Sequence, residues 1–335
     1  MSKKGEFKFV IVGTGNISNT YVNAINKIDG VSIAGFVSRS LKRPSSCTDP
    51  TIEAAGSIDK IKSEFDAVII CTPNGLHHKG AIEAASLGKH VLTEKPLDIS
   101  VDSMNEMINK CRGTGVKLGV AYQRRMSSGN IKMKRLIEEG TLGRIIAADL
   151  TVKNYRDEKY YNSGEYGGTL SIDGGGPFMQ QASHYVDLYG WFFGKPVKVV
   201  SMLGTFLHDI EGEDHGAAIL KHENGMIGTI IASTSAKPGF PARLEIHSEK
   251  GTVIMENDVI TGWYIEDTEN PSDAADKNNF TGASTAAVAE TTLHEAVIND
   301  FVESVRGNKE PAVTGEDAAL ATEIILNIYS NNINN

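Results

Sequence analysis

The chain has 335 residues, 40% of them hydrophobic, which is enough to bury two separate cores. Its formal net charge of −9 argues against nucleic acid as the main partner, because contacts to phosphates need clustered Lys and Arg. The charged start is followed by an apolar run, Phe9–Val12, that is too short for a signal peptide. No stretch approaches the ~18 apolar residues of a membrane span. We therefore expect a cytoplasmic protein with no membrane partner.

Up to about residue 124, short strands alternate with helices. The predicted strands are rich in β-branched residues and nearly continuous in hydrophobicity, which is typical of a parallel sheet buried on both faces. These strands are Phe7–Val12, Val31–Ser38, Ala67–Cys71, His90–Thr93 and Lys117–Tyr122. The helices predicted among them are Ile17–Ile28, Leu76–Leu87 and Val101–Cys111. This order predicts an α/β domain with a doubly wound parallel sheet over residues 1–124.

Residues 125–335 show a different pattern, in which strands follow one another with few helices. The predicted strands are Arg144–Lys153, Val197–Leu207, Gly216–His222, Met226–Ser235, Ala242–His247 and Thr252–Glu256. The predicted helices are Asn130–Glu139, Pro177–Phe193, Leu293–Val305 and Gly315–Tyr329. Turn signals such as Glu223-Asn224-Gly225 and Glu249-Lys250-Gly251 predict antiparallel hairpins. Asn270–Ala287 is rich in Ser, Thr, Asn and Ala and is expected to form a surface loop, within a second, α+β domain.

The strand Met226–Ser235 carries apolar residues on both of its faces. Ile227 and Ile231 share one parity, whereas Ile230 and Ala232 share the other. An exposed apolar sheet face usually marks an interface, so we expect a homodimer or homotetramer formed through the sheet of the second domain.

A glycine-rich loop follows the first strand, with the sequence Gly13-Thr14-Gly15-Asn16-Ile17-Ser18. It differs from the dinucleotide fingerprint G-x-G-x-x-G/A only at Ser18, where a small residue usually allows close packing of helix and strand. The backbone of such a loop and the start of the next helix can hold a pyrophosphate. The loop therefore predicts a Rossmann domain that binds a dinucleotide; the alternative is a glycine turn with no ligand.

The end of the second strand favours NADP over NAD. At Ser38 the sequence lacks the acid that NAD enzymes place on the ribose hydroxyls. Arg39 follows at once, with Lys42 and Arg43 close behind, and a guanidinium suits a 2′-phosphate. A solvated basic turn in an NAD enzyme is the alternative.

Lys95 lies just beyond the predicted strand His90–Thr93, within Glu94-Lys95-Pro96. Ligands of open α/β sheets bind at the carboxyl ends of the strands, so Lys95 can donate to a substrate oxygen there. The following Pro96 fixes the local backbone.

The chain resembles the glucose–fructose oxidoreductase and inositol dehydrogenase family, Gfo/Idh/MocA. The segments that carry the resemblance are Cys71–His77, Gly88–Leu97, Tyr122–Arg125, Asp173–Pro177, Asp300–Val302 and Val313–Ala318. The resemblance implies a Rossmann domain followed by a domain with a large open-faced sheet, and hydride transfer between NAD(P) and a sugar or polyol carbon. It also implies that Lys95 is the active-site Lys and His184 the catalytic His. The family usually has Asp four residues before that His, where this chain has Gln180, which puts in doubt any role for that carboxylate in proton transfer.

Helical spacing leads to the same pair of residues. Gln180 and His184 are four positions apart and are predicted to share one face of the helix Pro177–Phe193. His184 could act as a general base on a substrate hydroxyl, whereas the alternative is a histidine that only packs in the core.

The remaining candidate residues surround these motifs. For the cofactor, the candidates after the third and fourth strands are Thr72, Pro73, Asn74, His77, Glu94 and Lys95. For the substrate, they are Lys95, Gln123, Arg124, Tyr155, Arg156, Gln180 and His184. No metal is expected, because the three cysteines are scattered and lack zinc-ligand spacing.

Together these features predict an oxidoreductase that prefers NADP and acts on a sugar, sugar acid or polyol. Within the enzymes, the rival is a reductase of another carbonyl or imine, including nucleotide-linked sugars. The rival from another class is a dinucleotide-binding regulator without turnover, which would not need Lys95 and His184. A methyltransferase is a more distant third, because an acidic ribose contact is then expected at the end of the second strand.

Overall fold

A computed structural model of the chain describes residues 5–162, 166–272 and 290–333. Contacts divide the chain into two compact units: unit 1 is Met1–Gln123 with Ala287–Ala319, and unit 2 is Arg124–Ala286 with Leu320–Asn335. The sequence analysis assigns Ala287–Ala319 to the second domain, whereas by contacts this segment groups with unit 1. The predicted loop Asn270–Ala287 lies, from residue 273 on, outside the described residues.

Unit 1 contains a six-stranded parallel sheet, which confirms the predicted α/β class. Its strands are β1 (Phe7–Val12), β2 (Val31–Val37), β3 (Glu53–Ala55), β4 (Ala67–Ile70), β5 (His90–Thr93) and β6 (Leu118–Val120), in the order β3-β2-β1-β4-β5-β6. Every residue of β4 and β6 is buried, as expected for strands covered on both faces. The edge strand β3 was not predicted, because three residues of which one is Glu show no hydrophobic period.

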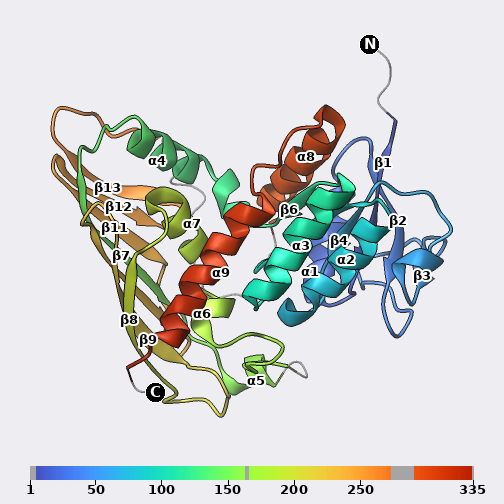
Figure 1. The fold of residues 1–335 in the computed structure, drawn as a ribbon, viewed down its shortest axis with the longest axis horizontal. Coiled ribbons are helices and arrows are strands. Elements are labelled where there is room, and N and C mark those ends of the chain that lie inside the picture. Colours follow the sequence, from blue (N-terminus) through green and yellow to red (C-terminus); the bar gives the residue numbers. More distant parts are fainter. Residues whose placement is uncertain (1–4, 163–165, 273–289, 334–335) are drawn as a thin grey trace. The chain divides into compact units, whose positions relative to one another are not determined.

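The helices of unit 1 pack in pairs. They are α1 (Asn16–Ile25), α2 (His77–Ser86), α3 (Val101–Thr114) and α8 (Thr292–Gly307), with short 3₁₀ helices η1 (Ile58–Lys60) and η2 (Asn74–Leu76). A third 3₁₀ helix, η3 (Gln123–Met126), begins at the last residue of this part of unit 1 and otherwise belongs to unit 2. α2 packs beside α3, and α1 beside α8 (Figure 1). Phe301 of α8 lies 6.1 Å from the ring of Phe9, and a Cβ on Gly119 would come within 2.7 Å of the Phe301 ring. This close packing is why α8 groups with unit 1.

Unit 2 contains a seven-stranded mixed sheet. Its strands are β7 (Ile145–Lys153), β8 (Lys198–Gly204), β9 (His215–Lys221), β10 (Ile227–Ser233), β11 (Arg243–Ser248), β12 (Gly251–Glu256) and β13 (Val259–Ile265), in the order β13-β12-β11-β7-β10-β9-β8. The predicted hairpins β9–β10 and β11–β12 are confirmed, and among the strand pairs described in this sheet only β7–β10 is parallel. β13 was not predicted; it follows a tight turn at Asn257 and Asp258, which both have positive φ.

The helices described in unit 2 cover one face of this sheet. They are α4 (Ser128–Glu138), α5 (Glu158–Tyr161), α6 (Pro177–Gln180), α7 (Ser183–Phe193) and the second part of α9 (Gly315–Ser330). Figure 1 shows α4, α7 and α9 on the same side of the strands. The core lies there and includes Leu150, Tyr189, Ile230 and Ile325, all at most 1% exposed.

The opposite face of the sheet carries exposed apolar side chains. Val200, Met202 and Ile219 are 40%, 55% and 58% exposed, and Val200 pairs directly with Ile219 across β8 and β9. Ile227 is 52% exposed, whereas Ile230 on the same strand is fully buried, which confirms the two apolar faces predicted for this strand.

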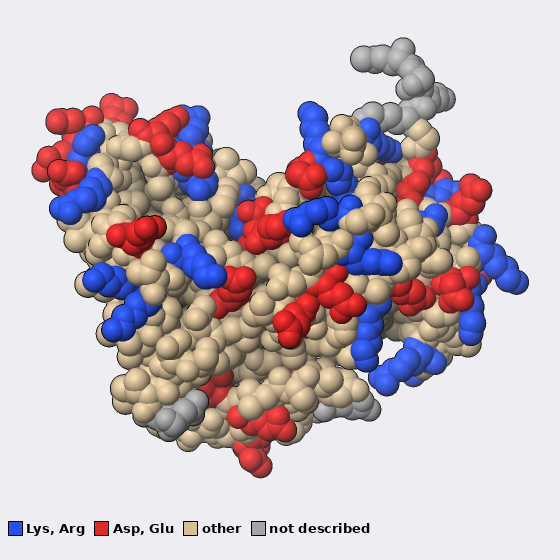
Figure 2. Space-filling model, viewed as in Figure 1, with Lys and Arg blue, Asp and Glu red and all other residues tan. Residues whose placement is uncertain are grey.

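Charge is mixed on the surface. The chain carries 33 Lys and Arg against 42 Asp and Glu. Figure 2 shows the two kinds interspersed over the visible face. Among the described helices, none is both long and apolar enough to cross a lipid bilayer.

Candidate functional site

Four parallel strands of unit 1 end at residues predicted to bind the cofactor. β1 leads into Gly13, β2 into Ser38, β4 into Cys71-Thr72 and β5 into Glu94. β1 and β4 are neighbours at the centre of the sheet, where the chain order reverses. Because open α/β sheets bind ligands at the carboxyl ends of their strands, at this switch point, the four loops form a candidate dinucleotide site.

The loop after β1 has the shape that a pyrophosphate needs. Gly13 has φ +93°, and a Cβ there would lie 2.6 Å from the carbonyl oxygen of Cys71, so only glycine fits. Gly15 is the N-cap of α1, and no described atom lies within 4 Å of a Cβ built on it. α1 then begins at Asn16, so its first N–H groups are available to an anion.

Ser18 explains how the loop departs from the usual fingerprint. Its side chain is buried, and its hydroxyl donates to the carbonyl of Gly15 at 2.5 Å. The extra oxygen is thus satisfied within the loop, and the close packing of α1 on the sheet is retained.

The loop after β2 carries two exposed arginines, and the side chain of one of them, Arg43, is bonded to backbone carbonyls. The Ser38 hydroxyl accepts from the Lys42 N–H at 2.9 Å and closes a tight turn. The guanidinium of Arg43 donates to the carbonyls of Ile52 and Pro50 at 2.8 and 3.1 Å. Arg39 is exposed in this loop. Because the Arg43 guanidinium is already bonded to these two carbonyls, Arg39 is a better candidate than Arg43 for binding a 2′-phosphate.

His77 ties the loops after β4 and β5 together. Its ring nitrogens lie 2.9 Å from the Thr72 carbonyl and 2.8 Å from the Pro96 carbonyl. The ring is buried, and this desolvation lowers the pKa of His77. The Thr72 hydroxyl, two residues after β4, is buried without a hydrogen-bond partner among the described residues. Thr72 thus offers an unsatisfied hydroxyl at the place expected to contact a dinucleotide.

Glu94 fixes the backbone at Lys95. One carboxylate oxygen accepts from the Tyr21 hydroxyl at 2.8 Å, and the other accepts from the Lys95 N–H at 3.1 Å. The Lys95–Pro96 peptide bond is cis. Tyr21, on α1, was not predicted from the sequence, because its partner lies 73 residues away.

His294 of α8 packs edge-on against Tyr21 at 5.6 Å, and we expect it to make unit 1 sensitive to acid. It is 2% exposed, neither ring nitrogen has a hydrogen-bond partner in the described part of the chain, and desolvation lowers its pKa although Glu94 opposes this. The unfolded chain takes up a proton near pH ~6.5 that the folded chain resists, so stability falls as pH drops below that value. We expect His294→Leu to reduce this loss, by up to about 1.4 kcal/mol per pH unit. The urea midpoints of the unaltered protein and of His294→Leu at pH 7.5 and 5.5 measure this loss of stability. An equal loss in the two proteins would contradict the prediction.

In unit 2, the predicted helix Pro177–Phe193 is wrong as a single helix. It is broken into α6 and α7, because the Pro177 carbonyl accepts from both Gln181 and Ala182, and the second bond spans five residues. Such a local π-type turn inserts a residue into the helical repeat. Gln180 ends α6 and His184 is the second residue of α7, so the expectation that they share one helix face fails.

The glycine run before α6 is packed against a buried carboxylate. Glu213 accepts from the N–H groups of Gly176 and Phe178 and from the Tyr329 hydroxyl, each at 3.1 Å. Burial raises the pKa of Glu213. A Cβ on Gly176 would lie 1.7 Å from the Glu213 carbonyl oxygen, and Gly175 has φ +134°, so the run must be glycine here. This contact fixes where α6 begins and hence where α7 carries His184.

The predicted substrate residues Tyr155 and Arg156 lie near the helix break. The Arg156 guanidinium lies over the ring of Tyr160 at 5.2 Å, and the Tyr160 hydroxyl accepts from the Gln181 side chain at 2.9 Å. Burial raises the pKa of Tyr160. The side chain of Gln180 donates to the Asp173 carbonyl at 2.7 Å, which holds it against the glycine run.

The other predicted substrate residues are less available. Arg124 forms an ion pair with Asp258 in the β12–β13 turn, and its guanidinium lies over Tyr185 at 4.3 Å. Its partner lies 134 residues away, which the sequence does not reveal. Gln123 begins η3 and is half-buried, with its side-chain oxygen unsatisfied among the described residues.

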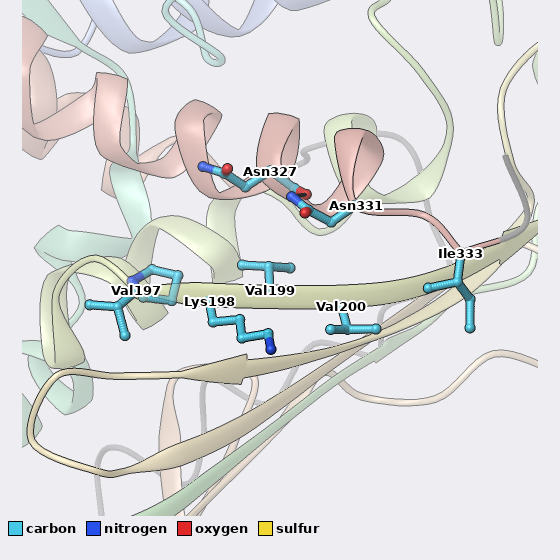
Figure 3. A pocket seen from close by; sticks show the side chains of 8 residues that line it. Val197, Lys198, Val199, Val200, Asn327, Asn331 and Ile333 are labelled. Carbon is cyan, nitrogen blue, oxygen red and sulfur yellow. Dashed lines mark hydrogen bonds between the residues drawn. The ribbon is translucent and has the colours of Figure 1, made fainter.

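A cavity of about 370 Å³ in unit 2 lies elsewhere, between β8 and the end of α9 (Figure 3). Val199 faces Asn327 and Asn331 across it, and Val200 and Ile333 also line it. None of the predicted site residues lines this cavity. In the described residues, no group of His, Cys, Asp and Glu could hold a metal ion.

Comparisons with known proteins cover both units. Residues 7–122 match the profile "Oxidoreductase family, NAD-binding Rossmann fold", and residues 130–254 match the "GFO/IDH/MocA C-terminal domain". The chain is 26% identical to 1,5-anhydro-D-fructose reductase of Ensifer adhaerens, over 93% of this chain and 92% of that protein. It is 26% identical to myo-inositol 2-dehydrogenase of Thermotoga maritima, over 76% and 74%. Among solved structures, the chain is similar to the WlbA dehydrogenase from Bordetella pertussis in complex with NADH and UDP-GlcNAcA. The two chains are 28% identical, and their structures superpose with a TM-score of 0.83 over 97% of this chain and 96% of that one.

Proposed function

The chain belongs to the Gfo/Idh/MocA family of NAD-binding oxidoreductases, and on this premise we propose that it transfers a hydride between NAD(P) and a hydroxyl-bearing carbon of a sugar, sugar acid or polyol. The observation that supports this most is the loop after β1, where only glycine fits at Gly13 and the start of α1 is open. The family relatives named above, which act on an anhydrosugar and an inositol, support the substrate class.

In the oxidation direction, His184 accepts the hydroxyl proton at a ring nitrogen, and Lys95 donates a hydrogen bond to the same oxygen. The chemistry that a bound nicotinamide dinucleotide supplies is hydride acceptance at C4 of its ring. Gly13, Gly15 and the start of α1 would hold its pyrophosphate, and Thr72 would contribute a hydroxyl from the loop after β4. Glu94 keeps the Lys95 backbone in place, because its carboxylate accepts a hydrogen bond from the Lys95 N–H.

A substrate panel tests this function. With NADP and NAD in turn, the protein is mixed with myo-inositol, D-glucitol, D-glucose, D-glucuronate and UDP-glucuronate, and the absorbance of reduced cofactor is followed. Reduction with at least one compound is the expected result. A different result would favour a dinucleotide-binding regulator instead. In that case the fluorescence of both reduced cofactors would show that they bind, but neither the compounds nor their oxidised forms would be turned over in either direction.

We further propose that NADP is the preferred cofactor, although the similar WlbA structure contains NADH. Exposed Arg39 would pair with the 2′-phosphate, and no acid is present at Ser38 to hold the ribose hydroxyls of NAD. Arg39→Ala should weaken NADP binding by about 1.5–3 kcal/mol, the scale of a hydrogen bond to a charged group. NAD binding, as the internal control, should change little. Steady-state kinetics in which the unaltered protein prefers NAD would refute this assignment.

The exposed sheet face of unit 2 supports a homodimer or homotetramer. Ile219 lies within the apolar patch formed with Val200 and Met202, so a charge there opposes burial of the patch. We expect light scattering to report an oligomer at micromolar concentration and Ile219→Glu to shift it towards the monomer. Ile131→Glu, at a similarly exposed apolar position on α4, is the matched control. A monomeric unaltered protein would contradict the proposal.

A further inference from the structure

A buried histidine lies behind the segment that carries Tyr155 and Arg156. His208 belongs to the loop from β8 to β9, and its side chain is 2% exposed. One ring nitrogen, Nδ1, lies 3.0 Å from a carboxylate oxygen of Asp214, and the other, Nε2, lies 2.9 Å from the carbonyl oxygen of Arg156. The sequence analysis did not single out His208, because its two partners come from different elements.

Both partners of His208 can only accept hydrogen bonds. The Asp214 side chain is fully buried, and it also accepts from the backbone N–H groups of Phe206, Leu207 and His208 at 2.9, 2.7 and 3.1 Å. A carbonyl oxygen is an acceptor only, so the His208 Nε2–H donates to the Arg156 carbonyl. Through Nδ1 the same ring contacts the Asp214 carboxylate, so the ring bridges Asp214 and the backbone of Arg156.

The same segment is held from its other sides. The Arg156 N–H donates to the Thr234 carbonyl at 2.8 Å. The ring of Tyr161 lies 4.9 Å from the His208 ring, and its hydroxyl lies 2.6 Å from that of Thr234. With its backbone fixed on both sides, Arg156 can hold its guanidinium over Tyr160, which is bonded to Gln181 at the helix break.

We propose that His208 is a positioning residue for the substrate: anchored by Asp214, its ring fixes the backbone of Arg156 so that the guanidinium meets the substrate. The proposal rests on the proposed function in that Arg156 contacts the substrate. His208 itself touches neither substrate nor cofactor, and its effect passes through the Arg156 carbonyl.

Two substitutions separate the two hydrogen bonds. His208→Asn keeps a donor near the Nδ1 position, towards Asp214, and loses the bond to Arg156. His208→Gln keeps a donor near the Nε2 position and can retain the bond to Arg156. His222→Asn is the matched control, because His222 is also buried in unit 2 and bonds through Nε2, but to Tyr189 at 3.0 Å.

The kinetic arm uses the panel compound with the highest kcat/KM. We expect His208→Asn to raise KM about three- to ten-fold with kcat within about two-fold, His208→Gln to restore most of the change, and His222→Asn to leave KM unchanged. Arg156→Ala should raise KM about ten-fold or more, and adding His208→Asn to it should raise KM no further. If the two substitutions raise KM independently, so that the double variant shows the product of the two fold-changes, the proposal is overturned.

A second arm needs no turnover. Amide hydrogen exchange over residues 154–161 should be faster in His208→Asn than in the unaltered protein, and unchanged in His222→Asn. If exchange is unchanged, the positioning role fails whatever the activity. If exchange rises but no panel compound turns over, the positioning of Arg156 stands and the proposed function is what has failed.

Discussion

Lys95→Ala should lower kcat by about 10²–10⁴-fold while the affinity for the cofactor stays nearly intact. The lost ammonium matters most in the transition state, as charge develops on the substrate oxygen, so kcat and kcat/KM should fall together. The substitution spares the loop itself, because Glu94 bonds the backbone N–H of residue 95 and His77 bonds the Pro96 carbonyl. Steady-state kinetics and cofactor fluorescence titration give the two measurements.

Lys89→Ala is the matched control for Lys95→Ala. Lys89 precedes the opposite, amino end of β5, where its ammonium donates to the Phe65 carbonyl at 2.7 Å and lies over the Phe65 ring at 4.5 Å. Its loss should lower stability slightly and leave kcat unchanged. If Lys95→Ala retains near-normal kcat, Lys95 takes no part in the reaction.

His184→Ala should also lower kcat by about 10²–10⁴-fold, and it should change the pH dependence of the rate. An imidazole must be neutral to accept the hydroxyl proton, so in the oxidation direction the rate should rise with pH through the ionisation of His184. This acid limb should disappear in His184→Ala and persist in His222→Asn. Profiles of kcat/KM against pH for the three proteins provide the test, and an acid limb that persists in His184→Ala would assign it to another group.

Local patterns predicted the elements that carry the cofactor loops. The continuous apolar strands β1, β4 and β5 bury both faces, so their limits follow from composition. Gly13 follows directly after β1, and Lys95 is the second residue after β5. The open apolar face of the sheet also followed from the alternation of Ile227 and Ile230. The roles of Lys95 and His184 came from the family resemblance and remain predictions.

Long-range contacts explain what the sequence did not reveal. The break between α6 and α7 depends on the Pro177 carbonyl taking two donors, and the neighbouring glycine run is packed against Glu213 and Tyr329. A period of 3.6 residues continues smoothly through this point, so the pattern favoured one helix. Similarly, His208 is tied to Arg156 at a separation of 52 residues, and no local signal records such a contact.

The central claim is that the substrate carbon gives its hydride to the nicotinamide, with Lys95 and His184 assisting. The direct test is a panel substrate carrying deuterium on the carbon that is oxidised, followed by mass spectrometry of the reduced cofactor. We expect one deuterium in the nicotinamide ring of the reduced cofactor. Where hydride transfer limits turnover, the labelled substrate should react more slowly than the unlabelled one. In Lys95→Ala the labelled product should be lost. Oxidised substrate accompanied by reduced cofactor that contains no deuterium, or labelled product formed equally well by Lys95→Ala, would contradict it.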